Sequence, residues 1–393
     1  MEPNNKLLII FKYPRGNWNP PVINKFSNFY ETEHVYISDY KNKNFIEIIN
    51  DINNLIESKN IDIVVFDVDY FKFINLFFVE KINCKKKILI SGDDFELHEM
   101  NSITASGCDL VLSGCPLSVL KYREKGFLSY WMHYEEGKIN KNNNKDEKEI
   151  DVLFFGSITP NRKKILDYLS KEGIKLKNVG HEEHTDGLPY EDILKLISKS
   201  KIIINFSKSR TESVKNYNSE NIYKFYYQWK GRMVMAGMCG SACVSEYSPG
   251  QELLFTDDEV PTFFTKEECL KILKELLSNK EKLESYTKKF VTKVQDICDD
   301  KKIFIPINNI IKKSDNKRVN LHKIPYWYLR IGAKQILLRN IKLKNLISTI
   351  SQFNIIFSII KNSNFAIKLL IISESIINII WYSLTSSLKF KKE

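Results

Sequence analysis

The sequence predicts an α/β protein of two doubly wound domains, each a parallel sheet with helices on both faces, followed by a basic, mostly helical tail. In two long stretches, short apolar runs rich in β-branched residues alternate with helical patterns. A polar segment, Gly137–Glu149, separates them. With 393 residues, the chain is long enough for two cores. We therefore predict domains at 1–136 and 150–312, a linker at 137–149 and a tail at 313–393.

The first domain contains five apolar runs that are typical of buried strands, with helical patterns between them. Strand and helix in alternation predict a parallel sheet. We expect strands at Leu7–Phe11, His34–Ile37, Ile61–Phe66, Lys87–Ile90 and Asp109–Leu112, and helices at Pro21–Tyr30, Asn44–Ser58, Phe73–Val79, His98–Ser106 and Pro116–Lys125.

The second domain repeats the alternation and closes with a long helix. The same pattern predicts a second doubly wound sheet. We expect strands at Val152–Phe155, Lys175–Val179, Ile202–Phe206 and Ala242–Ser245, and helices at Arg162–Lys171, Tyr190–Ser198, Tyr223–Met238, Lys266–Asn279 and Lys280–Ile297.

The net charge of +11 is concentrated in the tail. Leu321–Glu393 has eleven Lys or Arg residues and two acidic residues, a net charge of +9. The first 320 residues therefore carry only about +2, and nucleic acid is not an expected partner of the main body.

The cysteines predict a reducing compartment. There are seven, an odd number, without a C-x-x-C pair. The amino terminus has no basic segment ahead of its short apolar run, and we interpret it as a first strand rather than a signal peptide. Both features indicate a cytoplasmic protein.

The turn after the first strand of the second domain is a candidate anion site. Gly156 lets a ligand approach the backbone closely, and Ser157 supplies a hydroxyl. The helix that follows offers free N–H groups, with Arg162 and Lys164 on its first turns. Ligands of open parallel sheets bind at the carboxyl ends of the strands. The alternative is a tight turn followed by a solvated basic helix.

Two further stretches of the second domain carry candidate ligand-binding residues. Asn205 and Ser207 end a buried strand, where a polar group binds a ligand or caps the strand. Arg232 lies on a predicted helix that ends near Gly240, and the following strand stops at Glu246.

Together these stretches resemble a known family. "DVLFFGSITPNRKKILDYL", "YEDILKLISKSKIIINFS" and "GRMVMAGMCGSACVSE" resemble the carboxyl-terminal half of CgeB-like glycosyltransferases, in the group 1 set with the Rossmann-like GT-B fold. The resemblance spans about Asp151–Cys298; "KILISGDD" and Cys108–Phe127 resemble the first domain of the same family less specifically.

The resemblance implies a nucleotide-sugar donor in the second domain and a glycan, lipid-linked or protein acceptor in the first. It assigns the donor diphosphate to Arg162, Lys164, Asn205 and Arg232, with Gly156, Ser157, Gly240 and Glu246 as further donor-binding residues. No metal or other cofactor is expected. The family usually has Glu, which binds the ribose hydroxyls, where this chain has Met235. Either Glu246 or another acid compensates, or donor binding is altered or lost.

Catalytic candidates lie in the first domain. Asp93, Asp94 and His98 follow a strand at its carboxyl end, where a general base is expected; Asp94 as a helix cap is the alternative. A competing signal is the D-x-D triplet Asp67 to Asp69, which metal-dependent glycosyltransferases use to bind a divalent ion.

Two polar loops are expected to lie beside the substrates. Arg15, Asn17 and Trp18 are expected near the acceptor, while His181 and His184 are expected in a loop beside the donor base rather than as metal ligands.

The tail has the composition of a helix that lies in a membrane interface. Lys and Arg alternate with Leu and Ile after an aromatic start at Tyr326–Tyr328. Phe365–Leu384 is apolar, but Lys368 and Glu374 disfavour a true span. The alternative is a helical subdomain that covers the body or a dimer partner.

We therefore predict a GT-B glycosyltransferase for surface polysaccharide or glycoconjugate synthesis, in the cytoplasm at the inner face of the membrane. Two alternatives stay open: a non-catalytic scaffold on a decayed GT-B fold, and a metal-dependent transferase that uses Asp67 and Asp69.

Overall fold

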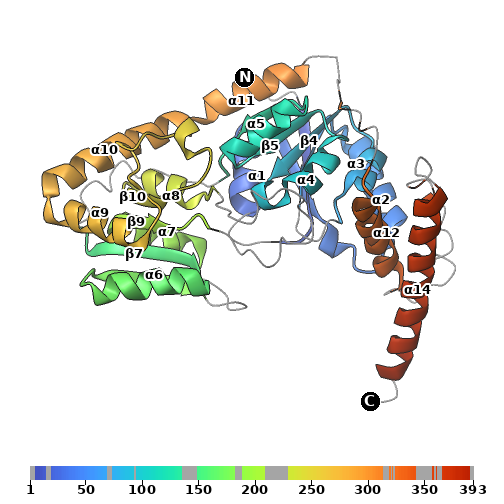
Figure 1. Ribbon diagram of the computed structural model, residues 1–393. Helices are drawn as coiled ribbons and strands as arrows, with labels where there is room; N and C mark the ends of the chain where they lie inside the picture. Colours follow the sequence, from blue (N-terminus) through green and yellow to red (C-terminus); the bar gives the residue numbers. More distant parts are fainter. Residues whose placement is uncertain are drawn as a thin grey trace.

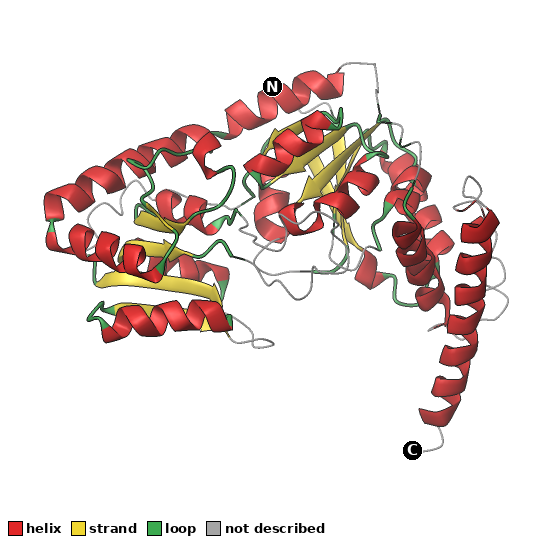
Figure 2. Ribbon diagram, in the orientation of Figure 1, coloured by secondary structure: helices red, strands yellow, loops and turns green. Residues whose placement is uncertain are grey.

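The computed structural model contains two parallel sheets with helices on both faces of each (Figures 1 and 2). It describes residues 5–14, 19–68, 73–92, 94–134, 148–181, 188–208, 229–312, 318–319, 321, 324–341, 356–357, 360 and 365–389. The predicted fold class, two doubly wound sheets and a helical carboxyl-terminal region, is confirmed.

The first sheet has six strands in the order β2-β1-β3-β4-β5-β6, all parallel. Its strands are β1 (Lys6–Phe11), β2 (Glu31–Tyr36), β3 (Ile63–Asp67), β4 (Lys86–Ser91), β5 (Leu110–Ser113) and β6 (Ser129–Trp131). The helices between them are α1 (Asn19–Ser27), α2 (Phe45–Lys59), α3 (Leu76–Lys81), α4 (Asp94–Ala105) and α5 (Pro116–Glu124). Strand β6 is not among the predicted strands, because three residues are too few for a periodic pattern.

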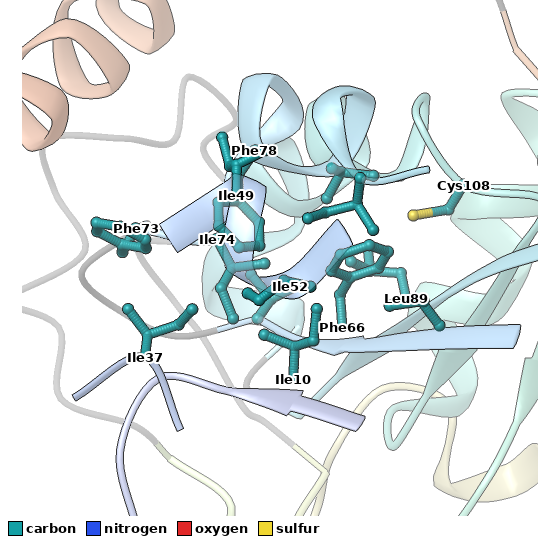
Figure 3. Packing of buried hydrophobic residues seen from close by; sticks show 14 of the residues in the cluster. Ile10, Ile37, Ile49, Ile52, Phe66, Phe73, Ile74, Phe78, Leu89 and Cys108 are labelled. Atoms are coloured by element: carbon teal, nitrogen blue, oxygen red, sulfur yellow. The ribbon is translucent and has the colours of Figure 1, made fainter. Parts of the chain in front are cut away.

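Alternation along β1 divides the core between the two faces of this sheet. Leu8 and Ile10 pack with residues of α2 and α3, in the cluster that Figure 3 shows. Leu7 and Ile9 face the opposite side, where side chains of α1 cover them. Both faces are therefore dry, as a parallel sheet requires.

The second sheet has five strands in the order β11-β10-β9-β7-β8, and its pairings are parallel. Its strands are β7 (Ile150–Ser157), β8 (Leu176–His181), β9 (Ser200–Asn205), β10 (Ala242–Glu246) and β11 (Thr262–Phe263). Its helices are α6 (Pro160–Lys171), α7 (Tyr190–Ser198), α8 (Arg232–Met238), α9 (Lys266–Ser278) and α10 (Lys280–Ile297). The two-residue β11 was also missed.

The predicted helix Tyr223–Met238 is wrong at its amino end. Trp229 and Lys230 are not helical, and α8 begins only at Arg232. Gly231 occupies the position before the helix, where its low helix propensity favours a boundary. Arg232 is therefore the first residue of a helix rather than a mid-helix residue; residues 223–228 lie outside the described part of the chain.

The helix after α10, α11 (Asp300–Lys312), returns to the first sheet (Figure 1). The predicted second domain, 150–312, includes these residues. However, Ile303, Phe304 and Ile307 are buried in the cluster that covers the α1 face of the first sheet. Helices α10 and α11 thus join the two sheets, because α10 is buried in the core of the second sheet and α11 in that of the first.

The tail contributes α12 (Tyr326–Ile341) and α14 (Phe365–Lys389). Tyr328 and Leu329 of α12 are buried against Leu76 and Phe77 of α3. The Tyr328 hydroxyl accepts a hydrogen bond from the Leu76 N–H at 2.8 Å, so α12 is part of the body. Across the described ranges, no helix combines the length and hydropathy that crossing a bilayer requires.

We expect Phe304→Ala to destabilise the protein by about 3–5 kcal/mol, the usual cost of truncating a buried Phe. Its ring lies 5.3 Å from that of Phe26 and 4.3 Å from that of Phe29, between centroids. Chemical denaturation measures the change. Ile305→Ala is the matched control, because Ile305 on the same helix is 45% exposed and should cost under 1 kcal/mol. Equal losses in both variants would contradict the packing of α11 on the first sheet.

Candidate functional site

Three neighbouring strands of the second sheet end in polar residues, and these lie together at the carboxyl edge of the sheet, where its strands end. Strands β7, β9 and β10 lie side by side and run in the same direction. Their last residues are Ser157, Asn205 and Glu246. Because ligands of open parallel sheets bind at this edge, it is the candidate site.

Arg162 extends across this edge from the first turn of α6. Helix α6 is capped by Thr159, whose hydroxyl accepts the Arg162 N–H at 3.4 Å. The guanidinium donates to the carbonyl oxygens of Ser157 at 2.8 Å, Lys208 at 3.1 Å and Phe206 at 3.4 Å. The side chain is buried, 7% exposed, so its charge is held at the strand ends rather than in bulk water.

Arg232 reaches the same place from the first residue of α8. Its Nη1 donates to Asn205 Oδ1 at 2.8 Å and to the Phe206 carbonyl oxygen at 3.4 Å. The guanidinium lies 5.3 Å from the ring centroids of Phe154 and Phe155, within cation–π range. Its Nε is buried and has no hydrogen-bond partner among the residues that the structure describes.

Arg162 and Arg232, the arginine pair, place two positive charges at one point. Each donates to the same carbonyl oxygen, that of Phe206, at 3.4 Å. Burial, together with repulsion from Arg162, lowers the pKa of Arg232 to about 9, which leaves it protonated at neutral pH. Buried like charges are costly unless an opposite charge compensates them. The chemistry of the arginine pair is therefore that of an anion site.

Gly156 makes room for the arginine pair. It has φ of +116°, a conformation that favours glycine, and a Cβ atom there would lie 2.5 Å from Arg232 Nη2. The backbone of β7 thus passes directly against the guanidinium. The sequence-based expectation that a ligand approaches Gly156 closely stays a prediction.

Glu246 holds the strand ends together. Its Oε2 accepts the N–H groups of Ser207 at 3.1 Å and Lys208 at 2.9 Å. Burial raises the pKa of this carboxyl, while the two N–H groups and Arg162 oppose the rise. Glu246 therefore supports the Phe206–Lys208 segment, whose carbonyl groups position Arg162, and one of its oxygens is committed to the backbone.

The structure does not bring two predicted donor residues to this cluster. Lys164 is exposed, because residues two positions apart on a helix point to different sides. Gly240 ends α8 with φ of +75° and precedes the amino end of β10, so it lies at the opposite edge of the sheet from Glu246. Met235 is buried in the core that includes Leu153. His184 lies outside the described residues, as does the side chain of His181.

Two catalytic candidates of the first domain, Asp94 and His98, lie in a buried polar network. Asp94 is fully buried and accepts hydrogen bonds from Tyr122 OH at 2.8 Å, Ser113 Oγ at 2.7 Å and Asn101 Nδ2 at 3.1 Å. Burial raises the pKa of Asp94, opposed by these donors. His98 is 1% exposed, with Nδ1 4.0 Å from Asp94 Oδ1. Both side chains are thus buried, and their catalytic role stays a prediction.

Other first-domain candidates lie partly outside the described chain. Asp93 and the loop residues Arg15, Asn17 and Trp18 are not described. Asp67 ends β3 and is 4% exposed, whereas Asp69 is outside the described ranges. In the described part, no three His, Cys, Asp or Glu residues are grouped as metal ligands.

Two contacts between the domains, which the sequence does not predict, bring the carboxyl ends of the two sets of strands toward each other. Trp131, at the end of β6, meets Trp229 edge-on with 6.4 Å between centroids. Gly250, with φ of +92°, approaches Leu117 so closely that a Cβ atom would lie 2.8 Å from its N. A signal was present, since Gly250 belongs to the turn sequence "SPGQ". Trp229 also lies three residues before Arg232, so this contact borders the anion site.

Two Rossmann-like sheets whose carboxyl edges are turned toward each other are the architecture of the GT-B fold class. Residues 145–296 match the family model described as glycosyl transferase-like. The predicted resemblance to group 1 glycosyltransferases is thus confirmed for the second half, whereas a CgeB-like specificity stays a prediction.

Solved structures support the fold. An alpha-glucosyltransferase in complex with UDP-glucose and DNA containing an abasic site is similar with a TM-score of 0.50 at 14% identity, covering 78% of this chain and 99% of its own. Sucrose-phosphate synthase from Thermosynechococcus elongatus has a TM-score of 0.50 at 7% identity, covering 78% and 98%. The likeness at these identities concerns the fold. A search of curated protein sequences finds no match.

We expect Gly156→Ala to impair anion binding more than stability. The atom that its Cβ meets is the end of a flexible side chain, so Arg232 moves away and the arginine pair is broken. Thermal shift with inorganic pyrophosphate measures the effect. The matched control is Gly173→Ala, because Gly173 also has positive φ, +88°, but has open space around it. Both variants should lose about 1–2 kcal/mol of stability. Only Gly156→Ala should lose the pyrophosphate shift; an unchanged shift contradicts this site.

Proposed function

We propose that the protein is a glycosyltransferase that moves a sugar from a nucleotide-sugar donor to a glycan, lipid-linked or protein acceptor. The observation that supports this most is the arginine pair, in which buried Arg162 and partly buried Arg232 meet at the carboxyl edge of the second sheet. A nucleotide-sugar presents a diphosphate, whose charge matches two guanidinium groups.

In this mechanism the arginine pair stabilises the leaving group. The bond between the sugar C1 and the diphosphate oxygen breaks, and its electron pair stays on the diphosphate. The acceptor hydroxyl forms the new bond to C1 and gives up its proton. Because negative charge grows on the diphosphate in the transition state, buried fixed cations lower the barrier. We propose that this stabilisation needs no metal ion.

The acceptor would lie against the first sheet, whose carboxyl edge faces the donor. We assign Asp94 and His98 a positioning role, because their network fixes Ser113, whose Oγ accepts the Cys115 N–H at 3.1 Å. Asp93 remains our candidate for the base that accepts the hydroxyl proton. We place the reaction in surface polysaccharide or glycoconjugate synthesis, at the cytoplasmic side of a membrane.

Calorimetric titration with UDP-glucose, followed by GDP- and ADP-sugars, tests the donor site. We expect binding by the wild type and a loss of about 10–100-fold in both Arg162→Met and Arg232→Met, because a charged hydrogen bond contributes about 1.5–3 kcal/mol. Lys164→Met is the matched control, an exposed cation on the same helix as Arg162, and should bind within about twofold of the wild type.

The titration and an assay of nucleotide release separate the two alternatives. If no nucleotide-sugar binds, the scaffold alternative is supported. If nucleotide release is abolished by chelator and by Asp67→Ala while Arg232→Met remains active, the metal-dependent alternative replaces our proposal.

A further inference from the structure

Helix α14 has one side packed on the body. Ile371 is 1% exposed and Ser375 is 3% exposed, and Ile371 belongs to the cluster that contains Tyr328 and Leu329 of α12. This side accounts for the attachment of α14, which lies alongside α12 and projects beyond it in Figure 1.

The other side of α14 is apolar and exposed. Five large apolar side chains are between 45% and 75% exposed: Phe365, Leu369, Leu370, Ile376 and Ile377. At 100° per residue these positions occupy one arc of the helix, opposite Ile371 and Ser375. We call this arc the α14 stripe. Contiguous exposed apolar surface of this kind marks an interaction site.

The one described polar side chain in the middle of the α14 stripe is satisfied within the helix. Ser373 Oγ donates to the carbonyl oxygens of Leu369 at 2.8 Å and Leu370 at 3.0 Å. Such back-bonding keeps the hydroxyl hydrogen-bonded when it leaves water for an apolar environment. The α14 stripe therefore suits an apolar medium along its described length.

The charge around the α14 stripe indicates which apolar medium it meets. Residues 321–393 carry a net charge of +9. The acidic residue within α14, Glu374, accepts a hydrogen bond from Arg330 Nε at 2.7 Å and is neutralised locally. A second copy of the chain would add a second tail of net charge +9, and like charges repel each other. An anionic lipid surface attracts the same charge.

We propose that the α14 stripe lies in the interface of an anionic lipid bilayer and holds the protein there as a peripheral protein. The stripe would insert its apolar side chains at the level of the headgroups, while the cations of the tail contact anionic lipid. The inference rests on the tail alone and does not depend on the proposed glycosyl transfer.

Flotation of the full-length protein with vesicles tests this proposal. We expect binding to phosphatidylcholine vesicles that contain 30% phosphatidylglycerol, weak binding to pure phosphatidylcholine, and a decrease at 0.5 M salt. Leu370→Ser should reduce vesicle affinity about tenfold, since a half-exposed Leu loses its lipid contact. Leu253→Ser is the matched control, because Leu253 on the second domain has the same 51% exposure, and it should bind like the wild type.

Three outcomes would overturn the proposal. They are equal binding to both kinds of vesicle, no difference between Leu370→Ser and Leu253→Ser, and a wild-type dimer in light scattering that Leu370→Ser dissociates without lipid. The last result would assign the α14 stripe to a second copy. UDP-glucose titration of Leu370→Ser should equal the wild type, so a failure of the lipid proposal is distinguishable from a failure of the donor site.

Discussion

The site depends on holding two guanidinium groups together inside the protein. Arg162 and Arg232 repel each other, and the lowered pKa of Arg232 reflects that repulsion and its burial. The two side chains are held in place by hydrogen bonds. They donate these to the carbonyl oxygens of Ser157, Phe206 and Lys208 and to the amide oxygen of Asn205. Carbonyl dipoles compensate only part of two full charges, so the free protein keeps an electrostatic cost that an arriving anion removes. On the proposed function, the same feature that lowers the stability of the free protein would raise its affinity for a diphosphate.

The fold supplies these acceptors through the direction of its strands. Because β7, β9 and β10 are parallel neighbours, their last residues are brought to one edge although they lie far apart in the sequence. Glu246 fixes the segment after β9 through two backbone N–H groups, and Asn205 Nδ2 donates to Ser245 Oγ at 2.9 Å. The arginine pair is therefore positioned by rigid elements, which is what stabilisation of a transition state requires.

Periodicity, and a strand followed by Gly-Ser and a basic helix, are local signals, so the sequence predicts most of the elements and indicates Arg162, whereas β6, β11 and the start of α8 are not predicted. The sequence was insufficient for Lys164 and Gly240, since only the helix geometry and the chain direction show that these residues leave the site. The buried network of Asp94 and the approach of Trp131 to Trp229 join residues that are distant in sequence, and no local pattern reports them. The return of α11 to the first sheet was missed for the same reason: its apolar face does not indicate which core it joins.

Met235 acquires a physical meaning from this arrangement. It stands three residues after Arg232 on α8, and side chains at that spacing are neighbours on a helix. A carboxylate there, as the resemblance to group 1 glycosyltransferases implies, would lie within reach of Arg232 and compensate its charge. The thioether instead packs in the core that includes Phe155 and Trp229 and carries no charge. Glu246 does not replace the missing acid at Arg232, because its Oε2 is bound to the backbone beside Arg162. On the proposed function, Met235 would leave the positive charge of the arginine pair available to a ligand, and the binding of an anionic donor group would depend more, not less, on Arg232.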